Sequence, residues 1–190
     1  MIRGKSQSIT LTVIGIRVGD EVMDPAKIQR IEKRLGHEFR DKKELLRALT
    51  HPTFSKEQRE KPVGARDCPH QSVYATLGDA VLKAGFISIL MDKGLKTKGD
   101  ITISKADLEN NLQLAKVGER LHLLEENYIQ HRAGNSEKLK ESAAALRSDT
   151  IEALIGAIYI DSDSSMPTVK KCISEIFSSE ISEMEKKFHL

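Results

Sequence analysis

The chain has 190 residues, of which 39% are hydrophobic and 31% charged, and its 30 basic residues nearly balance its 28 acidic ones. This composition is typical of one globular domain and excludes wholesale disorder, and the balanced charge does not by itself indicate a nucleic-acid binder. The two cysteines, Cys68 and Cys172, are widely separated, which favours a reducing compartment over a disulfide scaffold. The start lacks a secretory-signal pattern, and no apolar run reaches the roughly 18 residues of a membrane span, so we expect a cytoplasmic protein without a membrane segment.

The N-terminal segment has the pattern of β structure. Residues 8–18 alternate polar and apolar side chains and are rich in β-branched types, which predicts a strand or small hairpin that ends at Gly19 and Asp20. We therefore assign residues 1–22 to a β extension and residues 23–190 to a helical domain.

Two short helices are expected next. The first begins at Asp24 and Pro25 and stops at Gly36, and its apolar face is formed by Ile28, Ile31 and Leu35. The second opens at Asp41 and is limited by Pro52, with Leu45, Leu46 and Leu49 on one face. The polar and basic residues 56–70 predict a long loop, which could contact a phosphate backbone or simply be solvated. Within it, Cys68 and His70 could form half of a zinc site, but the sequence offers no second half.

The remainder predicts a compact all-helical bundle. Residues 72–91 are apolar nearly all round, which indicates a buried helix. Residues 133–145 have the composition of a flexible connection or a weak helix, and residues 148–160 predict a second buried helix. Two amphipathic helices complete the expectation: residues 101–121, with Leu108, Leu112, Ala115 and Leu121 facing inward, and residues 166–187.

Three carboxylates stand out against this apolar background. Asp79 is the only acid between residues 72 and 82, and a buried carboxylate needs a partner cation or a metal ion. Asp149 and Glu152 are three residues apart, so both can point in the same direction from a helix. Small residues in both segments would let the two helices approach closely. Oxygen ligands without His or Cys favour Mg²⁺, with Mn²⁺ as a substitute, and such a centre suits phosphoryl chemistry.

The same acids also have a purely structural interpretation. Asp149 could be the N-cap of a helix with Glu152 completing the capping arrangement. Asp79 could pair with Lys83 one helical turn later.

Longer stretches resemble the ribonuclease III family. Residues 77–82 (LGDAVL) are similar to the core of its signature, and residues 149–157 (DTIEALIGA) are similar to its second acidic motif. Residues 31–55 resemble its opening helices, residues 99–123 its middle segment, and Tyr159–Ile160–Asp161 follows as in the family. The resemblance extends from about residue 26 to 178, in order and spacing.

This resemblance implies a ribonuclease III-type helical bundle that acts as a magnesium-dependent endonuclease on double-stranded RNA. It implies Asp79 and Glu152 as catalytic, metal-binding carboxylates, and Asp149 as a further metal ligand or a residue just behind the ligands. It also implies a homodimer whose two sites face a shared valley, which suits A-form RNA. We expect a catalytic domain without a double-stranded RNA-binding domain after it.

The first motif departs from the family pattern. Ser72 and Ala75 stand where the signature has glutamates, and Thr76 stands where many members have an aromatic residue that contacts the partner subunit. The mini subclass of the family also has a small residue at the position of Ala75, and its members are nucleases. A catalytically weak or inactive RNA-binding or assembly protein, or a plain helical dimerisation module, are therefore the alternatives. Candidate RNA contacts are Lys96, Lys98, Lys138 and Lys140.

Overall fold

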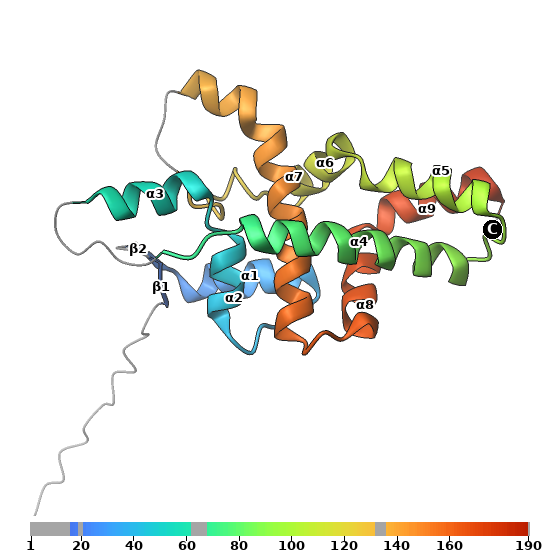
Figure 1. Ribbon diagram of the computed structural model, residues 1–190, viewed down its shortest axis with the longest axis horizontal. Helices are drawn as coiled ribbons and strands as arrows, with labels where there is room; N and C mark the ends of the chain where they lie inside the picture. The colour runs from blue at the N-terminus through green and yellow to red at the C-terminus, as the bar shows by residue number, and fades with distance from the viewer. Residues whose placement is uncertain (1–15, 19–20, 62–67, 132–135, 190) are drawn as a thin grey trace, which may run out of the picture.

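The computed structural model describes residues 16–18, 21–61, 68–131 and 136–189. In these ranges the protein is a helical bundle, as the sequence predicts, and one antiparallel hairpin precedes the first helix in the chain (Figure 1). Its elements are β1 (Ile16–Val18), β2 (Glu21–Met23), α1 (Pro25–Leu35), α2 (Lys42–Ala48), α3 (Pro52–Glu60), α4 (Ser72–Asp92), α5 (Lys98–Glu109), α6 (Asn111–Arg120), α7 (Ser136–Asp161), α8 (Met166–Ile176) and α9 (Ser178–Phe188).

The N-terminal prediction is confirmed in part. In the hairpin, Ile16 pairs with Met23 and Val18 with Glu21, so Gly19 and Asp20 fall between two strands rather than after the last one. The rest of the predicted strand, residues 8–15, lies outside the described residues. The proposed boundary between residues 22 and 23 stays a prediction, although β2 runs across it.

The first two helices form as their start signals predict. The Asp24 and Asp41 side chains accept hydrogen bonds from the Ala26 and Lys43 amides, at 3.0 and 2.9 Å. Gly36 ends α1 in the left-handed conformation (φ 66°), which glycine adopts without strain. The apolar side chains predicted for both helices are buried: Ile28, Ile31, Leu35, Leu45, Leu46 and Leu49.

Four predicted boundaries are wrong. α2 ends before Pro52, as expected, but Pro52 begins α3, in which the ring of His51 accepts a hydrogen bond from the Thr53 amide as an N-cap, so that α3 takes up the first part of the expected loop. The segment 101–121 is two helices, because Asn110 leaves the helical conformation and caps α6. The segment 166–187 is also two helices, separated at the buried Phe177. Finally, α7 begins at Ser136, so that the described part of the expected connection or weak helix is helical, and it continues through residue 148.

Two further expectations about burial are wrong. Leu112 was expected to face inward with Leu108, Ala115 and Leu121, but its side chain is 65% exposed. The long helix α4 is buried on one side only, because Val73, Ile87 and Met91 are exposed on the other. Against our expectation, α4 is long and apolar enough to meet the length and composition test for a membrane span, with a mean hydropathy of 1.4. Core helices pass the same test, and α4 contributes eight buried residues to this structure.

The crossing of α4 and α7 is the centre of the bundle (Figure 1). A Cβ atom on Gly78 of α4 would lie 1.7 Å from the carbonyl oxygen of Glu152, and one on Gly156 of α7 would lie 2.3 Å from that of Tyr74. Only glycine permits this separation, because any larger side chain would overlap the facing backbone. Around this contact, the apolar face of α7 is buried in the core; it consists of Ile151, Leu154, Ile155 and Ile158.

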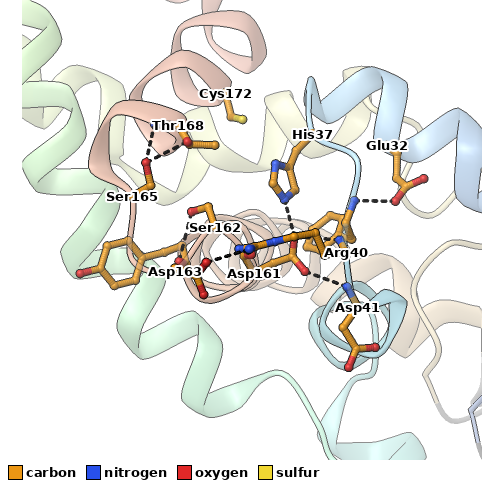
Figure 2. A network of polar contacts seen from close by, with 12 residues as sticks. Glu32, His37, Arg40, Asp41, Asp161, Ser162, Asp163, Ser165, Thr168 and Cys172 are labelled. Carbon is orange, nitrogen blue, oxygen red and sulfur yellow. Dashed lines mark hydrogen bonds and ion pairs between the residues drawn. The ribbon is translucent and has the colours of Figure 1, made fainter.

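A second contact fixes the C-terminal end of α7 (Figure 2). The buried carboxylate of Asp161 accepts hydrogen bonds from the amides of Arg40 and Asp41, at 3.0 and 2.9 Å, and lies 2.8 Å from Nε2 of His37. Burial opposes the charged form, but these hydrogen bonds outweigh it and lower the pKa of Asp161. The end of α7 is thereby attached to the segment that joins α1 and α2.

The glycine contact gives the first testable prediction. Gly78→Ala should lower the free energy of unfolding by at least about 2 kcal/mol, because the added methyl group must push the backbones apart. Gly99→Ala is the matched control, since the nearest atom to its Cβ would be 3.8 Å away. That variant should change stability by less than about 1 kcal/mol, toward greater stability. Urea unfolding measures both, and equal effects would contradict the close contact.

Candidate active site

The acids singled out in the sequence lie on the two central helices. Asp79 follows Gly78 in α4, and Asp149 and Glu152 are one turn apart in α7. The Glu152 carbonyl faces Gly78, so the close contact of the helices sets Asp79 and Glu152 side by side. Since α7 continues through residue 149, Asp149 lies inside the helix, and its interpretation as an N-cap is wrong.

The charges of these carboxylates interact. Burial, together with the charges of Asp79 and Asp149, raises the pKa of Glu152 to about 7, while Lys83 lowers it. Burial also raises the pKa of Asp149, against the opposing effect of His51. Like charges that share a partly buried region destabilise the ionised form, so this site favours a proton or a bound cation.

Asp79 is less buried than the sequence suggests. Its side chain is 42% exposed, and Oδ2 lies 2.7 Å from Nζ of Lys83, so the predicted pairing one turn along the helix is present. Ala75, where the family has an acid, is partly buried against the core. Ser72 and Thr76 are exposed, and the Thr76 hydroxyl donates to the Ser72 carbonyl at 3.2 Å.

The donor set fits a hard divalent cation in its chemistry. All three acids offer oxygen, which Mg²⁺ prefers, and Mg²⁺ keeps several water ligands when few carboxylates are available. In the part of the chain that the structure describes, no three His, Cys, Asp or Glu side chains are already grouped as ligands of one ion. Cys68 and His70 are likewise not part of such a group, so the zinc-site alternative gains no support. Because Lys83 donates a hydrogen bond to Asp79, a metal ion that binds Asp79 would have to displace Lys83 from it.

Two of the lysines expected to contact RNA lie away from the acids. Lys96 and Lys98 are exposed in the turn after α4 and at the start of α5. From Asp79 to the end of α4 is 13 residues, which corresponds to about 20 Å along the helix. The structure therefore does not bring this pair to the acids. The side chains of Lys138 and Lys140 lie outside the described residues.

Sequence reasoning missed two contributors to the site. His51 was not among the candidate site residues, yet its charge acts on Asp149. Burial lowers the pKa of His51, and so do the charges of His131 and His70. Glu109 at the end of α5 acts on Lys83. The sequence holds no local signal for Glu109, because only the packing of α5 against α4 brings it near.

The pKa of Glu152 predicts an unusual dependence of stability on pH. Without metal, the unfolded chain ionises this group near pH 4.5 but the folded chain only near pH 7. Unfolding therefore releases a proton between these values, and stability falls as pH rises through them. Allowing for partial exposure, Glu152→Gln should be more stable than the wild type by about 1–2 kcal/mol at pH 8, and equal to it near pH 4. Urea unfolding in EDTA measures this difference, and a pH-independent one would contradict the raised pKa.

Comparisons with known proteins agree with this architecture. Residues 41–180 match the model of the family described as Ribonuclease-III-like. The chain is 29% identical over 171 residues to Ribonuclease 3 of Natranaerobius thermophilus, an alignment that covers 90% of the chain and 68% of that protein. It is 31% identical over 153 residues to Ribonuclease 3 of Wolinella succinogenes, which covers 79% of the chain and 59% of that relative. The chain thus spans about two thirds or less of the length of these relatives.

A solved structure shows the same fold. The nuclease domain of ribonuclease III from Campylobacter jejuni superposes with a TM-score of 0.63 at 27% identity, over 86% of this chain and 99% of that one. The description of that structure refers to a region involved in dimer formation. These likenesses support an endoribonuclease of the ribonuclease III type. The chain belongs to the Ribonuclease-III-like family.

Proposed function

We propose that this protein is a magnesium-dependent endonuclease that cuts double-stranded RNA as a homodimer in the cytoplasm. The observation that carries the proposal is the placement of Asp79, Asp149 and Glu152 at the α4–α7 crossing, where burial and then the charges of the two aspartates raise the pKa of Glu152 to about 7. A divalent cation would relieve the repulsion between these carboxylates, and membership of the Ribonuclease-III-like family supports a role in RNA cleavage.

The roles of the residues follow from their positions. Asp79 and Glu152 would hold the metal from the two helices, and Asp149 would bind it directly or through water. Mg²⁺ bound there would supply an activated water and stabilise charge on the phosphate. Because the shell would lack an acid at Ala75, water ligands would complete it. The lysines at residues 96, 98, 138 and 140 stay candidates for RNA contacts outside the site.

The exposed side of α4 supports the dimer. Val73, Ile87 and Met91 are separated by intervals of about 3.6 residues or its multiples, so they form one stripe, and the small residues Thr76, Ala80 and Ala84 lie between them on the same side. A second copy that covers this stripe would bury apolar surface on the helix that carries Asp79. The candidate sites of the two copies would then lie on one face of the dimer.

Cleavage of RNA tests the catalytic part of the proposal. With Mg²⁺ or Mn²⁺, the wild type should cut a labelled RNA duplex, and Glu152→Gln should reduce the rate by about two orders of magnitude or more, since it removes a metal ligand. Asp107→Asn is the control, because that exposed acid pairs with Lys187 away from the site. If the wild type binds the duplex without cutting it, the alternative of an inactive RNA-binding protein is favoured. The absence of an acid at Ala75 is the reason for considering that alternative.

Sedimentation equilibrium tests the dimer. The double variant Val73→Lys, Met91→Lys should shift the wild-type dimer to monomer, because it places charges in the covered stripe. Ile160→Lys, which alters an exposed apolar residue at the far end of α7, should leave the dimer intact. A wild-type monomer, or equal behaviour of the two variants, would contradict an interface on α4.

A further inference from the structure

Lys83 places a positive charge inside the candidate site. Its Nζ atom lies 2.7 Å from Oδ2 of Asp79, and its side chain is 44% exposed. The hydrogen bond to Asp79, and then the charges of Asp79, Glu109 and Glu152, raise the pKa of Lys83. One ammonium group thus interacts with acids from three helices, α4, α5 and α7.

A neighbouring lysine is already committed elsewhere. Lys105 lies 2.6 Å from Oε1 of Glu109, and both side chains are largely buried, which fixes this pair. The other oxygen of Glu109, Oε2, is shielded from solvent and has no hydrogen-bond partner among the described residues. Lys105 therefore neutralises Glu109, and Lys83 is left to balance the acids of the α4–α7 crossing.

The contact between Lys83 and Asp79 can be exchanged for another. Ion pairs that are nearly half exposed contribute little to stability, because water solvates both partners well. A divalent cation binds a carboxylate more strongly than a single ammonium group does. Lys83 then has a flexible four-carbon side chain and a point charge that is free to bind phosphate oxygen.

We propose that Lys83 is a resident cation of the site with two successive partners. It neutralises Asp79 while no metal is bound, and it contacts a non-bridging phosphate oxygen of the RNA strand once a metal occupies Asp79. The inference rests on the proposed function, because it requires both the metal and the RNA. It assigns Lys83 as an RNA-binding residue of the active site, in place of a simple helix-stabilising pair.

Metal binding tests the first partner without any catalysis. In calorimetric titration of the metal-free protein with Mn²⁺, Lys83→Gln should bind about three- to tenfold more tightly than the wild type, because a competing cation is gone. Lys83→Arg keeps the charge and should stay close to the wild type. Lys171→Gln is the matched control, since it removes a lysine from another pair four residues apart, on α8, and should change nothing.

RNA binding tests the second partner. The affinity of the protein for an RNA duplex is measured at several salt concentrations, once in EDTA and once in Ca²⁺. Gel electrophoresis of the RNA verifies that it is not cleaved in these buffers. In Ca²⁺, Lys83→Gln should lower the affinity and reduce the magnitude of the slope of log K against log salt by about one for each site, as expected for a lost phosphate contact. In EDTA the slope should not change, because Lys83 is then held by Asp79. Lys83→Arg should restore the slope in Ca²⁺.

The outcomes separate the inference from the function on which it rests. If Glu152→Gln abolishes Mn²⁺ binding while Lys83→Gln changes neither the Mn²⁺ affinity nor the slope in Ca²⁺, the role of Lys83 is overturned and the metal site stands. If the wild type binds no Mn²⁺, the proposed function fails, and the inference fails with it.

Discussion

The backbone contact between Gly78 and Glu152 is the constraint on which the rest of this structure depends. It is reciprocal, because Gly156 faces the Tyr74 backbone in the same way one turn along each helix. Two points fix the course of α7: this contact in its second half and the Asp161 carboxylate at its end, which is held by the amides of Arg40 and Asp41. With both points fixed, the position of Glu152 relative to Asp79 is determined by backbone packing and not by a flexible loop.

The same contact creates the electrostatic character of the site. Helices that touch through glycine bring acids closer than ordinary side-chain packing allows, and burial then prevents water from screening them. The raised pKa of Glu152 is the result. Lys83 offsets part of this repulsion through its charge on Glu152, and His51 acts in the same way on Asp149 when its ring is protonated. The site is thus built to accept additional positive charge, at a cost to the stability of the metal-free fold.

Sequence reasoning predicted the parts of the structure that depend on local signals or on a long motif. Capping by Asp24 and Asp41, the left-handed Gly36 and the glycine approach of two helices all follow from residue types at fixed spacing. It failed where one residue permits two structures. Asn110 can continue a helix or cap the next one, and Pro52 can stop a helix or start one. It also failed for Glu109 and Leu112, because burial and charge contacts there depend on how α5 and α6 pack.

Two residues of α4, Ala75 and Lys83, make the candidate site less negative than the family pattern at Ala75 would. Ala75, Asp79 and Lys83 are spaced four residues apart, so they follow one another along the same side of the helix. The family pattern has an acid at the first of these positions, and this chain has alanine there and a lysine two turns later. The alanine removes a negative charge that the family pattern has, and Lys83 adds a positive one, so both residues make the site less negative, and a less negative site attracts fewer divalent cations. The ammonium group of Lys83 lies 2.7 Å from Oδ2 of Asp79, so its positive charge is held beside the acid that the first motif retains. The first motif of this chain therefore carries a different distribution of charge from the family pattern, with one acid fewer and one ammonium group beside Asp79.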